Sequence, residues 1–381
     1  MLYLDNAATG PVRREVLEAM LPHLARAFGN PSSHHTVGER AAGVLADARA
    51  RVARVLGVRA GDVVFTSGGT EANNLAVKGI SLAALAHRGR THLVTTAIEH
   101  ESVLASADHL RRFHAFDITY LPVDADGRVD PDAVLAAVRP ETALVSLGYA
   151  NNEIGTVQDV ASVASALTER GIPLHLDAVQ AAGWLPIDRA TTGADALALS
   201  GHKLGAPQGT GVLAVRGRIP LEPVLHGGGQ ERGRRSGTEN VAGAVAIATA
   251  LELAERERPA DAARVAAARD ALIAGVCGAV AGARLTGHPH HRLPGTASFV
   301  FPRTSGEAIL LEMERRGIVS SSGSACAAGS DEPSHVLTAM GIDGDVARTA
   351  VRITLPHGFD AEILPLVNTV ADSVAAVQSG A

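Results

Sequence analysis

Between residues 63 and 215 the sequence alternates short apolar runs with longer stretches of helical periodicity. This alternation predicts β-α-β units and a mainly parallel sheet that helices cover on both faces, an α/β fold. Seven runs are expected to form its strands: 63–66, 93–96, 118–121, 143–147, 173–176, 194–199 and 212–215. Helices are expected at 40–56, 71–86, 102–112, 160–170 and 241–257.

The pattern changes near Pro259, where a helical segment rich in Ala, Arg and Asp (261–276) precedes a Gly/His/Pro-rich stretch. Further on, strands are expected at 296–301, 317–320 and 350–355, with helices at 306–316 and about 361–377. This mixture predicts a second, smaller α+β domain. We expect a large domain over residues 14–258 and a small domain formed by residues 1–13 and 259–381.

Composition restricts the class of protein further. Hydrophobic residues make up 46% of the 381 positions and aromatic residues only 3%, which predicts a globular core of mainly Ala, Val and Leu. The formal net charge is -6 and there is no long basic run, which argues against a nucleic-acid-binding protein. No apolar run is long enough to span a bilayer and the start lacks a signal-peptide pattern, so we expect the cytoplasm.

Lys203 follows the buried run 194–199 directly, within the sequence Ser200-Gly201-His202-Lys203. Ligands of open α/β sheets bind outside the carboxyl ends of the strands. A lysine at that place can form a Schiff base with an aldehyde cofactor, for which pyridoxal phosphate is the usual candidate. The alternative is a surface lysine in a turn.

The sequence also contains a candidate phosphate site and a candidate acid at the positions that this cofactor requires. Gly69 and Thr70 lie between a predicted strand and a predicted helix, whose N-terminus favours an anion; the alternative is an ordinary glycine turn. Asp177 ends another apolar run and could bind a protonated pyridine nitrogen, or could only cap the next helix. Gln180, one turn later, could bind the phenolic oxygen of the same ring.

Two further positions follow predicted strands. His100 could lie over a flat ring and move protons near neutral pH, or could only cap a helix. An asparagine of Asn151-Asn152 could reach the phenolic oxygen, or could only form a turn.

The two cysteines lie in different surroundings. Cys277 stands among apolar residues, which predicts a core position. Cys326 stands in a small, polar loop at about 321–334, where a thiol can be accessible and reactive. The alternative is an inert thiol in a linker.

Taken together, these motifs resemble the cysteine desulfurases, which belong to the class V aminotransferases and to the fold type I pyridoxal-phosphate enzymes. The resemblance runs through nearly the whole chain and is carried by residues 3–8, 29–33, 66–74, 151–155, 200–203, 226–232, 235–238, 321–326 and 351–352. The loop around Cys326 is similar to that of the long-loop group, which transfers sulfur to partner proteins.

The resemblance implies a mainly parallel seven-stranded sheet, a smaller α+β domain and a homodimer. It implies that Lys203 binds the cofactor, Asp177 its pyridine nitrogen and His100 its ring, and that Cys326 is the nucleophile. Gln180 and Asn152 would lie near the phenolic oxygen. Arg352 and Asn152 would bind the substrate, Arg352 through the substrate carboxylate. The phosphate would be held by Gly69, Thr70, Ser200 and His202, and by Thr238 of the other subunit. No residue is assigned to a metal.

The implied activity converts L-cysteine to L-alanine and leaves the sulfur as a persulfide on Cys326. An acceptor or scaffold protein, in iron–sulfur cluster assembly or thiolation, would then receive it. A selenocysteine lyase, another lyase or aminotransferase of this fold, and a non-catalytic sulfur-transfer scaffold are the alternatives.

Overall fold

The computed structural model describes residues 1–323 and 332–379. Its centre is a seven-stranded sheet in the order β2-β8-β7-β6-β5-β3-β4, in which β8 runs antiparallel to both of its neighbours and the other pairs are parallel. The predicted α/β class and mainly parallel sheet are therefore confirmed. The strands are β2 (Val63–Thr66), β3 (His92–Thr96), β4 (Asp117–Leu121), β5 (Thr142–Gly148), β6 (Leu174–Asp177), β7 (Ala196–Ser200) and β8 (Gly211–Val215).

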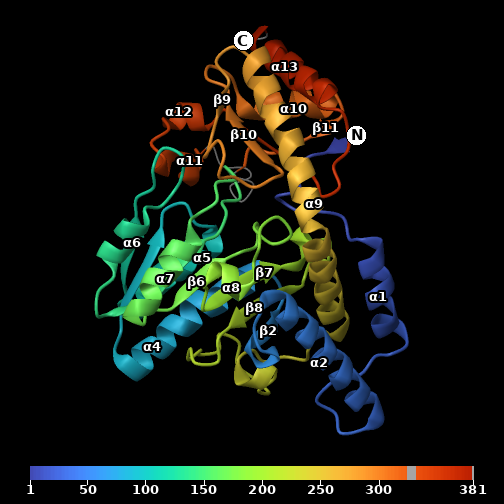
Figure 1. Ribbon diagram of the computed structural model, residues 1–381, viewed down its shortest axis with the longest axis vertical. Coiled ribbons are helices and arrows are strands. Elements are labelled where there is room, and N and C mark those ends of the chain that lie inside the picture. The colour runs from blue at the N-terminus through green and yellow to red at the C-terminus, as the bar shows by residue number, and fades with distance from the viewer. Residues whose placement is uncertain (324–331, 380–381) are drawn as a thin grey trace.

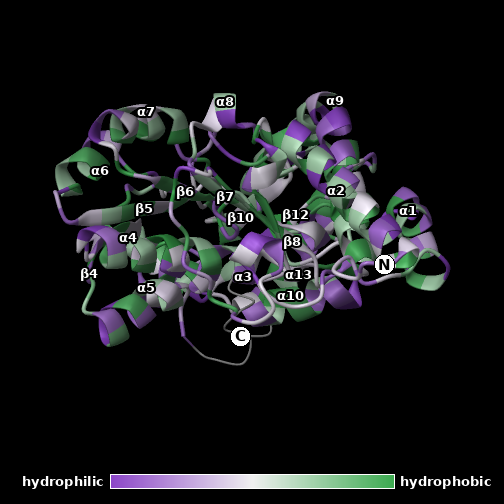
Figure 2. Ribbon diagram, turned by 90° about the horizontal axis from the view of Figure 1, so that it is seen from below, coloured by the Kyte–Doolittle hydropathy of each residue, from purple (hydrophilic) through white to green (hydrophobic). Residues whose placement is uncertain are grey.

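Helices cover both faces of this sheet because its strands are apolar on both sides (Figure 2). In β7, Leu197 and Leu199 pack into one apolar cluster, and Ala196 and Ala198 pack into another on the opposite face. The first cluster includes residues of α2 (Thr36–Leu56), α7 (Val160–Arg170) and α9 (Val241–Ala279). The second includes residues of α3 (Gly69–Asn74), α4 (Ile80–Arg88) and α5 (Glu101–His114). The helices α1 (Arg14–Ala25), α6 (Pro131–Ala137) and α8 (Arg189–Thr192) complete this part.

The single helix expected over residues 71–86 is interrupted. A π-helical turn at Leu75–Gly79 joins α3 to α4. A Cβ on Gly79 would stand 2.6 Å from the carbonyl oxygen of Glu222, so the backbone passes closer there than a side chain allows. Periodicity alone does not reveal such a turn, which is often found near functional sites.

A second, smaller sheet lies at the other end of the molecule (Figure 1). Its antiparallel order is β12-β10-β9, and beside it β1 pairs in parallel with β11. The N-terminal strand thus joins the C-terminal part of the chain. The elements here are β1 (Leu2–Tyr3), β9 (Arg284–Leu285), β10 (Thr296–Val300), β11 (Ile318–Val319), β12 (Ala350–Thr354), α10 (Gly306–Arg315), α11 (His335–Ala339), α12 (Gly344–Ala347) and α13 (Ile363–Ser379).

Helix α9 connects the two parts without a break (Figure 1). The sequence predicts separate segments on either side of Pro259, but this proline lies inside the 39-residue helix. Residues of α9 up to Ala254 pack into the core of the large sheet, and those from Val265 onward pack into the core of the small one. The division into domains at residues 258 and 259 stays a prediction.

Among the described residues, no helix is both long and apolar enough to cross a membrane.

Candidate active site

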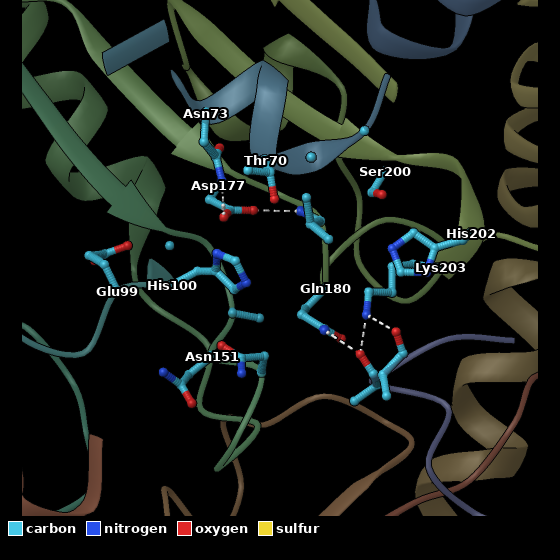
Figure 3. A pocket seen from close by; sticks show the side chains of 18 of the residues that line it. Thr70, Asn73, Glu99, His100, Asn151, Asp177, Gln180, Ser200, His202 and Lys203 are labelled. Atoms are coloured by element: carbon cyan, nitrogen blue, oxygen red, sulfur yellow. Dashed lines mark hydrogen bonds between the residues drawn. The ribbon is translucent and has the colours of Figure 1, made fainter. Parts of the chain in front are cut away.

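A cavity of about 470 Å³ lies at the carboxyl ends of the central strands (Figure 3). It brings together residues that are far apart in the sequence and come from both parts of the chain. Ten of the predicted site residues line it: Gly69, Thr70, His100, Asn152, Asp177, Gln180, Ser200, His202, Lys203 and Arg352. This volume lies in the range of small-molecule sites in proteins.

Lys203 and Asp177 reach the cavity from neighbouring strands. Asp177 is the last residue of β6, and Lys203 ends a short 3-10 turn that follows β7. The two strands are parallel, with Asp177 opposite Ala198, so their carboxyl ends meet at one edge of the sheet. Lys203 Nζ donates hydrogen bonds to the carbonyl oxygens of Ala7 and Ala8 in the N-terminal segment.

The Asp177 carboxylate is held by two donors. Its Oδ2 accepts a hydrogen bond from Asn73 Nδ2 at 2.6 Å, and its Oδ1 accepts one from the backbone N–H of Val179 at 3.0 Å. The second bond closes a local turn, and the residues after Asp177 form turns rather than the helix that the capping interpretation expects. Asp177 also lines the cavity, so this local bond does not keep it from the site.

His100 also combines two roles. It is the N-cap of α5, where its Nδ1 accepts a hydrogen bond from the backbone N–H of Ser102 at 3.0 Å. Its ring lines the cavity together with Asp177 (Figure 3). Helix capping therefore fixes the imidazole in the cavity wall.

The predicted phosphate end of the cavity is tightly packed. A Cβ on Gly69 would stand 2.7 Å from Val179 Cγ2 and 3.3 Å from Ser200 Cβ, so a larger residue would disturb the turn. His202 Nδ1 lies 3.1 Å from Thr9 Oγ1. Burial, and next the charge of Lys203, lower the pKa of His202 to about 4, so this imidazole is neutral at pH 7.

The amide residues differ in how they are held. Gln180 Nε2 donates to the carbonyl oxygen of Ala7 at 3.0 Å, which uses one of its two N–H bonds. Asn151 forms a turn, because its Oδ1 accepts from the backbone N–H groups of Glu153 and Ile154 at 2.8 and 3.0 Å. Asn152 lines the cavity, and its carbonyl oxygen accepts from Arg352 Nη1 at 2.8 Å.

Arg352 is almost fully buried and is already paired with a carboxylate. Its Nη2 lies 2.6 Å from Asp5 Oδ1, and its Nη1 also donates to the carbonyl oxygen of Gly323 at 3.2 Å. Its Nε has no hydrogen-bond partner among the described residues. A substrate carboxylate at Arg352 would therefore share the guanidinium with Asp5.

Glu99 brings an unexpected acid to the cavity wall. Its Oε1 accepts a hydrogen bond from Thr96 Oγ1 at 2.7 Å. Complete burial, with a smaller contribution from the charge of Asp177, raises its pKa to about 8. At pH 7 this carboxyl group is therefore mostly protonated and neutral.

The remaining predicted positions are Thr238, Cys326 and Cys277. Thr238 is exposed and is not part of the lining of this cavity. Cys326 lies outside the described residues. Cys277 is exposed, so its predicted core position is wrong: its neighbour Val276 takes the buried face of α9, and the next residue turns about 100° away from it.

Sequence reasoning missed Asn73, Glu99, Ser102 and Asp5 as parts of the site. The spacing of Asn73 from Thr70 is a signal that could have found it, because residues three apart share a helix face. Asp5 belongs to the N-terminal motif at residues 3–8, but nothing local links that motif to Arg352.

The sequence profile described as aminotransferase class V matches residues 2–362. The chain therefore belongs to this family of pyridoxal-phosphate-dependent enzymes, which confirms the predicted cofactor.

Its similarities within the family are specific. It is 44% identical over 377 residues to a protein of Bacillus subtilis (strain 168) named putative cysteine desulfurase IscS 1, covering 99% of this chain and 98% of that one. A solved structure named NifS-like protein superposes with a TM-score of 0.90 at 34% identity and covers both chains completely. Another, described as SspA in complex with cysteine, has a TM-score of 0.82 at 36% identity and covers 94% of this chain and 99% of that one.

The residues of the cavity fit pyridoxal phosphate. The carboxylate of Asp177 suits a protonated ring nitrogen, the amine of Lys203 suits an aldehyde, and Thr70, Ser200 and neutral His202 offer donors to a phosphate. The close packing around Gly69 lets the backbone approach such a group.

Proposed function

We propose that this chain is a cysteine desulfurase, which converts L-cysteine to L-alanine and passes the sulfur, as a persulfide on Cys326, to an acceptor protein. The observation that carries the proposal is the convergence of Lys203 and Asp177 on one cavity whose lining also includes Gly323. Gly323 precedes Cys326 by three residues in the sequence. The acceptor would serve iron–sulfur cluster assembly or a thiolation pathway.

Pyridoxal phosphate, when bound, supplies an electron sink for the substrate carbon that loses a proton. Lys203 would bind the cofactor aldehyde, and Asp177 would accept the hydrogen bond of the pyridine N–H. Gln180 and Asn152 would contact the phenolic oxygen. His100 would lie over the ring, where its imidazole can hold or move a proton.

The phosphate would be held by Gly69, Thr70, Ser200 and His202. His202 suits this role in its neutral form, because Nδ1 can accept from the Thr9 hydroxyl while Nε2 carries the proton. This arrangement leaves one N–H donor on the other side of the ring for an anion.

Arg352 would bind the carboxylate of L-cysteine, for which its planar fork is suited. The substrate would thus be held at its carboxylate while Lys203 Nζ takes the proton from its α-carbon, which regains a proton only after the sulfur has left. The Cys326 thiolate then attacks the substrate sulfur. The new S–S bond forms as the C–S bond of the substrate breaks. The electron pair of the C–S bond stays with the carbon that carried the sulfur, and this carbon gains a proton on the way to alanine.

The working unit would be a homodimer, because Thr238 faces solvent rather than the cavity of its own chain. Coexpressing Lys203→Ala and Thr238→Ala chains tests this. In a dimer that shares Thr238, the hybrid regains one intact site, so a statistical mixture should recover about a quarter of the wild-type activity. If the coexpressed mixture is no more active than the two variants prepared separately and then combined, the shared site is contradicted.

The decisive experiment is a mass spectrum of the protein before and after L-cysteine, with alanine assayed in parallel. We expect a gain of one sulfur on the peptide that carries Cys326, together with alanine. Cys277 is an internal control, because it is exposed to the same reagents but lies outside the cavity lining. Cys277→Ala should keep the sulfur gain, and Cys326→Ala should lose it.

Alanine without sulfur on Cys326 would instead favour direct elimination or lyase chemistry, and neither product would favour an aminotransferase or a scaffold. Comparing L-cysteine with L-selenocysteine separates the selenocysteine alternative. The cytoplasm is the proposed location, because a reducing compartment keeps a nucleophilic thiol free.

A further inference from the structure

Asn73 joins the predicted pyridine-binding acid to a second side chain. It is 1% exposed, and its Nδ2 lies 2.6 Å from Asp177 Oδ2 and 2.9 Å from Ser102 Oγ. An amide nitrogen carries two hydrogens, so one group can donate to both oxygens. Figure 3 shows Asn73 directly beside Asp177 in the cavity wall.

Ser102 continues the chain of contacts to His100. Its hydroxyl oxygen lies 2.8 Å from His100 Nδ1, which also accepts the backbone N–H of Ser102. Four side chains, from Asp177 through Asn73 and Ser102 to His100, thus form one connected network. Its two ends are the residues expected to touch the cofactor ring.

The direction of hydrogen-bond donation in this network follows from chemistry. An ionised Asp177 only accepts, so the nitrogen of Asn73 must face it. The same nitrogen donates to Ser102 Oγ, which leaves the Ser102 proton for His100 Nδ1. Because Nδ1 accepts, a neutral His100 must carry its proton on Nε2.

We propose that Asn73 and Ser102 are positioning residues for the reaction, which together fix the Asp177 carboxylate and keep the proton of neutral His100 on Nε2. This inference rests on the proposed function, since it assumes a pyridine nitrogen at Asp177. Asn73 Oδ1 is buried without a hydrogen-bond partner in the part of the chain that the structure describes. Such an unsatisfied buried atom calls for an explanation. The orientation of this side chain is therefore set by the two bonds that its Nδ2 donates, to Asp177 and to Ser102.

The Ser102 hydroxyl can be tested with two substitutions of nearly equal shape. Ser102→Thr keeps a hydroxyl and Ser102→Val removes it. We expect Val to lower kcat about tenfold with an unchanged KM for L-cysteine, and Thr to stay within about threefold of wild type. Ser106→Ala is the matched control, because Ser106 is a buried hydroxyl on the same helix that donates to a backbone carbonyl, that of Ser102.

Asn73→Ala tests the other end of the network. Because Asn73 contacts Asp177 directly, we expect a roughly tenfold weaker affinity for pyridoxal phosphate, measured from the absorption of the bound cofactor as apoprotein is titrated. Ser102→Val should keep that affinity within about twofold. In the double variant the losses in kcat should fall short of multiplying, as expected for residues of one network.

The outcomes separate this proposal from the proposed function. Wild-type protein that gains no cofactor absorption, or that binds the cofactor but makes no alanine, would contradict the function. Normal wild-type behaviour with equal kcat for Ser102→Thr and Ser102→Val would overturn the positioning role of Ser102. Multiplying losses in the double variant, or unchanged cofactor affinity in Asn73→Ala, would overturn the coupling through Asn73.

Discussion

Arg352 and Asp5 form a buried ion pair in which Nη2 and Oδ1 are 2.6 Å apart, although 347 positions separate the two residues in the sequence. The Arg352 side chain is 2% exposed and that of Asp5 is 16% exposed. A buried arginine is costly without a partner, so Asp5 keeps this guanidinium in the cavity wall when no substrate is bound. The same carboxylate then competes with a substrate carboxylate.

Asp5→Asn should therefore lower the KM for L-cysteine by roughly threefold to tenfold and leave kcat unchanged. The amide keeps the shape of the side chain but removes the competing charge. Steady-state kinetics measures the effect, and cysteamine, which lacks a carboxylate, is the control substrate whose KM should not move. A higher KM for L-cysteine would mean that Asp5 mainly orients Arg352.

The attachment site of the cofactor can be tested sharply, because Lys78 and Lys203 are the only lysines of the sequence. Borohydride reduction of the cofactor-loaded protein should add one pyridoxyl group, found by peptide mass spectrometry at Lys203. Lys203→Arg should lose the label and at least about 10² of the activity. Lys78→Arg is the matched control, which should keep the label at Lys203. A label found on Lys78 of the wild-type protein would disprove the assignment.

The sequence predicts the central strands and the residues that follow them well. Lys203 and Asp177 could be placed because each comes directly after an apolar run, and consecutive parallel strands bring such positions to one edge of a sheet. Their roles needed the combination of motifs, since each residue alone also suits a turn or a cap. His100 and Asp177 do in fact form such local bonds.

Contacts between distant segments could not be predicted in the same way. The pairing of Asp5 with Arg352 depends on the N-terminal segment, in which β1 pairs with β11 and Asp5 bridges Thr354 of β12, and no local pattern in the sequence indicates this. The π-helical turn at Leu75–Gly79 and the continuity of α9 through Pro259 are likewise set by packing. Cys277 shows the reverse error, because apolar neighbours in sequence do not imply a buried face of a helix.

The buried pair of Arg49 and Glu231 should stabilise the segment that leads to Thr238. The two side chains form a bidentate contact with distances of 2.6 and 2.8 Å, and both residues are less than a tenth exposed. Arg49→Met leaves the Glu231 carboxylate buried without its partner, and it should lower the free energy of unfolding by about 3–5 kcal/mol.

Urea unfolding measures this loss, and the double variant Arg49→Met/Glu231→Gln should recover part of it. Arg14→Met is the control, because the pair of Arg14 and Glu18 is exposed and should contribute less than about 1 kcal/mol. Equal losses at the two arginines would show that burial does not set the strength of these pairs.

Glu99 should make the stability of the protein fall as the pH rises. Burial raises its pKa in the folded protein from 4.5 to about 8, so between these values the folded state holds a proton that the unfolded state has lost. Stability decreases with pH wherever the folded state binds more protons, and the cost reaches roughly 4 kcal/mol near pH 8. Glu99→Gln removes this titration while keeping the shape of the side chain.

The Tm of Glu99→Gln relative to wild type should therefore increase steadily from pH 5 to pH 8. Both proteins are kept saturated with pyridoxal phosphate, so that a change in cofactor affinity is not read as a change in folding. Glu101→Gln, which alters an exposed carboxylate two residues away, should show no such trend. A Tm difference independent of pH would mean that Glu99 is ionised in the folded protein, and its charge would then add to that of Asp177 in the cavity wall.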